Sequence, residues 1–121
     1  MFEISKAVTF EAAHFMGSQP EGHPYRNVHG HSFRLDVAIR GRVKAEEEWV
    51  EDFSLLTREL NAVAGKLDHK LLNEIEGLSV PTLERVCLWV ARELKAALPG
   101  LTRVSLSRPS LNETCTLDLK G

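Results

Sequence analysis

Two long stretches in which apolar and polar residues alternate constrain the fold of this 121-residue chain more than any other feature. In residues 2–14 one face is apolar except for Lys6 and carries Phe2, Ile4, Val8, Phe10 and Ala12. In residues 29–40 the corresponding face carries Phe33, Leu35, Val37 and Ile39. A period of two residues is typical of a strand buried on one side. We therefore predict two amphipathic strands joined by a loop over residues 15–28, which contains two glycines and two prolines.

Two helices and two shorter strands are predicted downstream. Apolar residues recur at helical spacing in residues 53–67, after Asp52 as N-cap, and in a second helix that begins at Thr82 and ends at Pro99-Gly100. Residues 102–108 and 113–119 alternate again, and the "PSLN" segment between them predicts a hairpin turn. The order ββααββ predicts an α+β fold in one domain, 1–121, with an antiparallel sheet and both helices on one face.

Composition excludes several classes of protein. With 43% hydrophobic and 26% charged residues the chain can form a core, and a net charge of −2 gives no reason to expect nucleic acid or an anionic membrane as partner. No apolar run approaches the roughly twenty residues of a membrane helix. The N-terminus lacks the features of a signal peptide, and the two cysteines do not form a disulfide framework. We expect a cytoplasmic protein.

Three histidines share the apolar face of the two long strands. His14 continues the apolar face at the end of the first strand, and His29 and His31 begin the apolar face of the second. If the strands pair as an antiparallel hairpin, the three rings converge at one end of that face. Residues two apart on a strand are about 6.6 Å apart, so two such rings can lean toward one ion. Three nitrogen ligands with an open fourth position are typical of catalytic zinc.

A different interpretation treats these histidines as ordinary half-buried residues with local hydrogen bonds. Burying several unpaired polar rings on an apolar surface costs on the order of 1–3 kcal/mol each, and a metal removes that penalty. The shared face therefore favours a metal site. His23 lies outside the strand alternation and is interpreted as a loop residue.

Five motifs resemble one known family. "FEAAH" (10–14), "HGHSF" (29–33), "LDHKLLN" (67–73), "PTLE" (81–84) and "ETCT" (113–116) occur in the order found in the 6-pyruvoyltetrahydropterin synthase family. They are most similar to its bacterial branch, 6-carboxytetrahydropterin synthase of the queuosine pathway. The resemblance implies the tunnelling fold, in which ββααββ subunits form a trimeric barrel and two trimers stack as a hexamer.

The resemblance also implies a reaction and its residues. His14, His29 and His31 match the family's zinc ligands, and Asp68 and His69 match an Asp-His pair that acts on a site formed largely by a neighbouring subunit. The implied substrate is 7,8-dihydroneopterin triphosphate. Triphosphate is expelled and, in the queuosine branch, acetaldehyde is released and 6-carboxytetrahydropterin remains. Without the resemblance, Asp68-His69 is equally well interpreted as a helix C-terminal cap.

The chain departs from the family at its catalytic cysteine. Tyr25 occupies that position, four residues before the "HGH" motif. A phenol, with an ordinary pKa of about 10, is a poorer base at neutral pH than a thiol at about 8.5. Tyr25 is therefore a candidate catalytic residue or a packing residue, and Glu21 and His23 are other candidates. This departure leaves open an altered reaction, another pterin substrate, or a non-catalytic protein that binds pterin or metal.

The second departure concerns the glutamate that anchors the pterin in the family. An ungapped count places Arg108 at this position, whereas the "ETCT" match selects Glu113. We favour Glu113 as the substrate-binding residue; alternatively, the two side chains form an ion pair across the turn. Cys115 and Cys87 are interpreted as core thiols, although Cys115 is a conceivable substitute nucleophile. Candidate triphosphate-binding residues are Lys6, Arg26 and Lys70.

Overall fold

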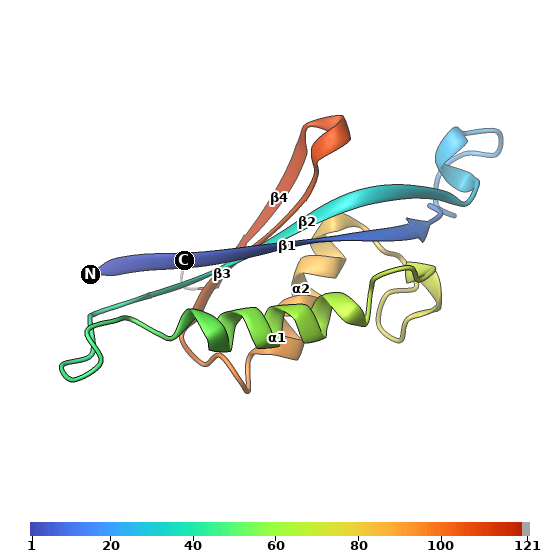
Figure 1. The fold of residues 1–121 in the computed structure, drawn as a ribbon. Helices are drawn as coiled ribbons and strands as arrows, with labels where there is room; N and C mark the ends of the chain where they lie inside the picture. Colours follow the sequence, from blue (N-terminus) through green and yellow to red (C-terminus); the bar gives the residue numbers. More distant parts are fainter. Residues whose placement is uncertain (120–121) are drawn as a thin grey trace.

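The computed structural model describes residues 1–119 and contains one four-stranded antiparallel sheet. Its strands are β1 (Phe2–His14), β2 (His29–Gly41), β3 (Leu101–Arg108) and β4 (Glu113–Asp118), arranged in the order β1-β2-β3-β4. β1 and β2 are the long strands of Figure 1, and the loop that joins them projects beyond one end of the sheet. The predicted α+β fold, the antiparallel sheet and the element order ββααββ are confirmed.

Both helices lie on the same side of the sheet (Figure 1). Helix α1 (Phe53–Gly65) packs against β1, and α2 (Leu83–Leu94) packs against β3 and β4. The predicted N-caps are confirmed, since Asp52 accepts a 2.8 Å hydrogen bond from Ser54 N and Thr82 accepts a 3.1 Å bond from Arg85 N. These contacts satisfy backbone donors that the first helical turn leaves free.

The register of the long hairpin decides where the histidines lie. His14 pairs with His29, Ala12 with His31 and Phe10 with Phe33, so all of these side chains lie on the face that carries the helices. The rings of Phe10 and Phe33 stack with centroids 5.1 Å apart, and both are buried. The histidines therefore lie directly beyond the end of the hydrophobic core.

The apolar face of β1 is buried only in part. Phe10 and Ala12 are buried, whereas Phe2 is 59% exposed, because the start of β1 extends beyond the helices that cover the rest of the sheet (Figure 1). The sequence pattern predicted the face correctly, but alternation alone carries no information about how far the helices reach. The core is consequently concentrated toward the histidine end of β1.

Some predicted element ends differ from the structure; helix α1, for example, ends at Gly65 and not at Leu67. Helix α2 ends at Leu94, not at Pro99-Gly100, and the chain makes one further turn in which Leu98 N donates to Leu94 O. A residue before proline avoids helical geometry, which keeps this turn from continuing the helix. The "PSLN" turn is a short 3₁₀ helix, Pro109–Leu111, followed by Asn112 in the left-handed conformation at φ 54°.

The segment after α1 covers part of the free edge of β1. Ala13 N donates to Lys70 O at 2.9 Å, and Ala13 forms a parallel bridge with Leu71. Covering an edge in this way satisfies its backbone groups and fixes residues 68–71 beside the sheet. No helix within residues 1–119 is both long enough and apolar enough to span a membrane.

Candidate active site

The three predicted metal ligands converge in the structure. One nitrogen from each of His14, His29 and His31 lies within 4.8 Å of the others. The ring centroids are 4.6, 5.0 and 4.9 Å apart, and the ring planes are inclined to one another by 69°, 86° and 89°. Three rings that meet nearly at right angles can direct three nitrogens at one point, which is the arrangement that a three-histidine metal site requires.

Buried polar atoms in the cluster test whether these residues fit a metal. Nδ1 of His14 and Nε2 of His31 are buried and have no hydrogen-bond partner among the described residues. A buried nitrogen without a partner is costly, and coordination of a cation removes part of that cost. The donor set of neutral imidazoles suits zinc and other borderline divalent metals. The residues therefore fit a metal ion.

Burial and nearby charges keep His14 and His31 in the neutral form that binds metals. Burial lowers the pKa of His14 to about 4, helped by the nearby His29, His31 and Arg108, while the backbone of Pro81 acts in the opposite sense. Burial and then Arg108 also lower the pKa of His31. An imidazole must be neutral to bind a metal, and a lowered pKa makes the neutral form available at pH 7.

Asn73 is a supporting residue that the sequence analysis did not single out. Its amide oxygen accepts a 3.0 Å hydrogen bond from Phe15 N, and its amide nitrogen donates to Phe15 O at 2.9 Å. The same nitrogen donates to Ser79 O at 3.3 Å. These bonds fix the backbone immediately after His14. The signal was available, because Asn73 ends the "LDHKLLN" motif.

Tyr25 lies beside the histidine cluster, on the loop between β1 and β2. Its ring stacks on the ring of His29, with centroids 5.5 Å apart and planes inclined by 27°. His23 caps the short helix Pro24–Arg26 by accepting a 3.1 Å hydrogen bond from Tyr25 N, and its ring lies 5.0 Å from the Tyr25 ring. Arg26 donates to the carbonyls of Gly17 and Gln19 at 2.9 and 2.8 Å, which stabilises the loop.

A pocket of about 430 Å³ joins this loop to the end of the sheet. Its lining includes Tyr25, His14, Arg108, Glu113 and Cys115. The volume lies within the range of small-molecule sites. The structure therefore brings Tyr25 and Glu113 to the same cavity as one of the candidate metal ligands.

The two candidates for the anchor position contact each other. Nε of Arg108 lies 3.1 Å from a carboxylate oxygen of Glu113, because these residues are register partners at the end of β3 and the start of β4. The ion pair considered in the sequence analysis is thus present. It does not exclude Glu113 from binding a ligand, because the carboxylate is 46% exposed and lines the pocket.

The side chains of Asp68 and His69 contact each other at the edge of β1. Nδ1 of His69 lies 3.0 Å from Asp68, and the two side chains are 79% and 42% exposed, respectively. Glu11 N donates to Asp68 at 2.9 Å, and this bond, followed by the contact with His69, lowers the pKa of Asp68. His69 has φ 59°, an uncommon conformation for a residue with a side chain.

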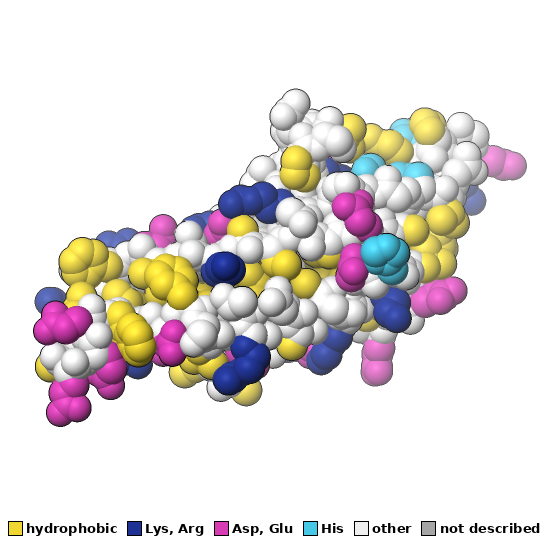
Figure 2. All heavy atoms as spheres, viewed as in Figure 1, with side chains coloured by type: hydrophobic (Ala, Val, Ile, Leu, Met, Phe, Trp, Pro, Cys, Tyr) yellow, Lys and Arg dark blue, Asp and Glu magenta, His cyan; other side chains and the backbone are white. Residues whose placement is uncertain are grey.

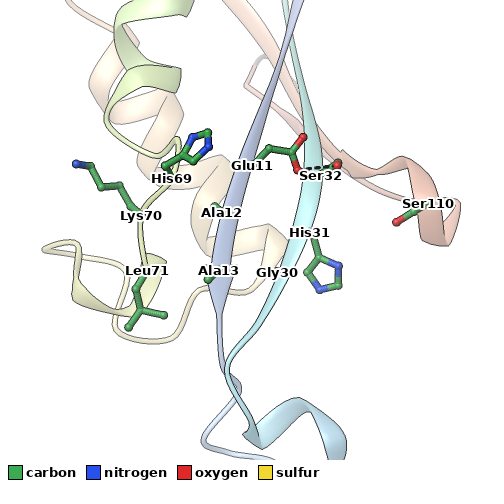
Figure 3. A pocket seen from close by; sticks show the side chains of 10 residues that line it. All are labelled: Glu11, Ala12, Ala13, Gly30, His31, Ser32, His69, Lys70, Leu71 and Ser110. Atoms are coloured by element: carbon green, nitrogen blue, oxygen red, sulfur yellow. Dashed lines mark hydrogen bonds between the residues drawn. The ribbon is translucent and has the colours of Figure 1, made fainter.

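The Asp68–His69 pair does not line the pocket that contains Glu113. His69 instead lines a cavity of about 610 Å³ with residues of β1 and β2, and Glu11 and Ser32 there form a 2.7 Å hydrogen bond. Figure 3 shows His69 and Lys70 beside β1, with His31 directed away from His69. Figure 2 shows the visible histidine side chains in the half of the molecule that carries the β1–β2 loop.

The remaining candidate residues, two cysteines, a glutamate and a lysine, lie outside the histidine cluster. Cys87 is buried in the core, where burial and then Cys115 raise its pKa to about 12. Cys115 is half-buried and lines the pocket beside His14. Glu21 is exposed on the loop, and Lys6 is exposed on β1. None of these four residues belongs to the convergent cluster of His14, His29 and His31.

The fold and the cluster first define a class of protein: an α+β domain whose antiparallel sheet carries a candidate three-histidine metal site. Comparison with known proteins then identifies the family. Residues 3–119 match the family model described as 6-pyruvoyl tetrahydropterin synthase. The chain belongs to the 6-pyruvoyl tetrahydropterin synthase family, and it is an enzyme, a lyase of this type.

Individual relatives support the assignment. A 6-carboxy-5,6,7,8-tetrahydropterin synthase of Synechocystis is 40% identical over 96% of this chain and 89% of the relative. A dihydroneopterin monophosphate aldolase of Pyrococcus furiosus is 35% identical over 87% of this chain and 83% of the relative. The solved 6-pyruvoyl tetrahydropterin synthase of Caenorhabditis elegans has the same fold, with a TM-score of 0.85 at 23% identity, covering 97% of this chain and 94% of that one.

Proposed function

We propose that this chain is a zinc-dependent pterin lyase of the 6-carboxytetrahydropterin synthase type. It converts 7,8-dihydroneopterin triphosphate to 6-carboxytetrahydropterin, with release of triphosphate and acetaldehyde. The observation that carries the proposal is the convergence of His14, His29 and His31 on one point at the edge of a ligand-sized pocket. The 40% identity to a relative named as that synthase supports the reaction.

The metal and its ligands define one side of the proposed site. His14, His29 and His31 hold Zn²⁺. When bound, the ion supplies Lewis acidity that polarises the side-chain oxygens of the substrate and makes the neighbouring C–H bonds more acidic. The stacking of Tyr25 on His29 helps to fix the orientation of that ligand.

Side chains of this protein bind the heterocycle and move protons. Glu113 accepts hydrogen bonds from the N–H groups of the pterin, because its exposed carboxylate lines the pocket. Tyr25 acts at the position of the family's cysteine as a proton donor or acceptor. Asp68 lies 3.0 Å from Nδ1 of His69 and orients its ring, which suits His69 for proton transfer.

The Asp68–His69 pair acts on the site of a neighbouring subunit in a homo-hexamer made of two trimers. The pair is exposed, and neither residue lines the pocket that contains Tyr25 and Glu113 in its own chain, although His69 and His31 both line the larger cavity; the separation from Tyr25 and Glu113 supports this division. Left-handed backbone at His69 costs free energy and is common at functional positions. The enzyme acts in the cytoplasm on a small molecule, without nucleic acid or membrane.

The test is to incubate the purified protein with 7,8-dihydroneopterin triphosphate, with Zn²⁺ present and with it removed by a chelator. We expect triphosphate release and a product with the mass of 6-carboxytetrahydropterin only with the metal. The variant His31→Ala is expected to be inactive, and Arg42→Ala, which changes an exposed residue after β2 outside the cluster, provides the control. Absence of triphosphate release from the metal-loaded protein would contradict the proposal.

An aldolase that acts on dihydroneopterin monophosphate is the second candidate. Tyr25 at the position of the family's cysteine favours it, and a relative at 35% identity bears that name. An aldol cleavage breaks a carbon–carbon bond of the side chain without first expelling phosphate. Release of inorganic phosphate or triphosphate, measured beside product mass, therefore distinguishes the two reactions.

A further inference from the structure

Arg108 is a half-buried cation at the edge of the pocket, at the position that an ungapped count assigns to the family's glutamate. It ends β3, and Glu113, its register partner, begins β4. Its side chain is 19% exposed, and it lines the pocket together with His14, Tyr25 and Glu113. A largely buried arginine at a ligand-sized pocket is costly unless it interacts with an anion or with hydrogen-bond acceptors.

The ion pair with Glu113 leaves both partners able to bind a ligand. Nε of Arg108 lies 3.1 Å from Glu113, yet Nε is buried without a hydrogen bond, so the contact is electrostatic and poorly aligned. A guanidinium has five N–H donors and a carboxylate has about four acceptor sites. The single contact between them therefore cannot saturate either group.

The guanidinium also lies toward the histidine cluster. Burial is the largest cause of the lowered pKa of His31, and the charge of Arg108 is the second largest. The charge of Arg108 also contributes to the lowered pKa of His14. Its charge is thus close to the part of the pocket where the reacting end of a substrate would lie. Glu113 and Arg108 together present acceptors and donors side by side on the same wall.

The chemistry of a pterin matches this pair. The pyrimidine edge of a pterin carries two N–H donor positions, the 2-amino group and N3, followed by the 4-oxo acceptor. We propose that Arg108 donates a hydrogen bond to the 4-oxo oxygen while Glu113 accepts from the two donors, so that Arg108 determines specificity for the 4-oxo ring. This inference rests on the proposed function, because it requires a pterin in this pocket.

The specificity for the 4-oxo ring follows from the hydrogen-bonding groups that a 4-amino ring would leave unpaired in the pocket. In a neutral 2,4-diaminopteridine an amino group replaces the oxygen and N3 carries no proton, which places a donor against Arg108 and a lone pair against Glu113. Sites that hydrogen-bond a substrate group reject analogues that leave their polar groups unpaired. Arg108 and Glu113 therefore both disfavour the diamino ring, and loss of Arg108 removes its share of that exclusion.

The experiment compares the affinities of the metal-loaded protein for 6-hydroxymethylpterin and 2,4-diamino-6-hydroxymethylpteridine, using ligand fluorescence near pH 7, where both rings are neutral. The unmodified protein is expected to prefer the pterin, and Arg108→Met to lower the ratio of the two affinities by about tenfold or more. The control Arg42→Met, which removes an exposed arginine after β2, is expected to keep the ratio. Glu113→Gln is expected to weaken both ligands.

Arg108→Lys provides the same readout in case the Met variant does not fold. Lysine keeps the charge but lacks the planar fork that can contact a carboxylate and a carbonyl together, so a smaller fall in the ratio is expected. If the protein binds the pterin and neither variant changes the ratio, Arg108 has only a structural role and the inference is overturned. If the unmodified protein binds neither ring, the proposed function fails, and the inference fails with it.

Discussion

Nε2 of His14 lies 3.0 Å from Nε2 of His29. Two nitrogen lone pairs at this distance repel each other unless a proton or a cation lies between them. We therefore expect Zn²⁺ to stabilise the folded protein, by about 2.7 kcal/mol when free metal exceeds its dissociation constant a hundredfold. Thermal unfolding measured with Zn²⁺ and after chelation checks this prediction.

The same measurement on two variants assigns the effect to the cluster. His31→Ala removes a ligand whose Nε2 is buried without a partner, so it should abolish the stabilisation by metal. His23→Ala changes a histidine on the loop and should retain it. An unfolding temperature that does not respond to Zn²⁺ in the unmodified protein would contradict the metal site.

Tyr25→Phe separates proton transfer by the phenol from packing by the ring. The variant keeps the stacking on His29 and loses the hydroxyl group. If the phenol transfers a proton, kcat should fall by about 10²–10⁴-fold, while stabilisation by metal is unchanged. Unchanged turnover would show that the ring only packs.

Mixing two inactive variants tests whether Asp68 and His69 serve a neighbouring subunit. His31→Ala lacks the metal site and His69→Ala lacks the exposed ring. If each site combines the cluster of one subunit with the pair of another, equal mixing of subunits after dissociation and reassembly should restore about a quarter of full activity. Separate assays of the two variants give the baseline. Activity that stays at this baseline in confirmed mixed oligomers would place the pair and the cluster in a single subunit.

The sequence predicted the parts of the site that depend on periodicity. Alternation assigned His14, His29 and His31 to the apolar faces of their strands. Antiparallel pairing brought them together, because directly paired residues of neighbouring strands point to the same side of the sheet. The caps of both helices were predictable for a similar reason. A capping side chain needs only a short, local sequence.

Contacts between distant segments were not predictable from periodicity. The hydrogen bonds of Asn73 to Phe15 join residues 58 positions apart. The "LDHKLLN" motif points to Asn73, but no local pattern identifies Phe15 as its partner. The ion pair of Arg108 with Glu113 was considered, but its location in a pocket with Tyr25 depends on how the β1–β2 loop folds back. His69 is exposed because it lies beside β1, at the edge of the sheet. A single sequence does not reveal which strand forms that edge.

Asn73→Ala should weaken both the fold and the metal site. The variant removes hydrogen bonds to Phe15 and Ser79 and leaves partly buried backbone groups unpaired, which costs about 1–3 kcal/mol of unfolding free energy. Because Phe15 follows His14, we also expect lower Zn²⁺ affinity in a chelator competition. Asn61→Ala, which changes an exposed asparagine of α1, is the matched control. Unchanged affinity together with lower stability would limit Asn73 to a structural role.

The two cysteines should differ sharply in reactivity. Burial and then Cys115 raise the pKa of Cys87 to about 12, so at pH 8 its thiol remains protonated and is shielded from reagents. Cys115 is half-buried and lines the pocket beside His14. We expect a disulfide reagent to modify one thiol of the folded protein and two after denaturation, and Cys115→Ser to remove the fast reaction.

A bound pterin should slow labelling of Cys115, because both occupy the same pocket. Equal labelling of Cys87 in the folded state would contradict its place in the core.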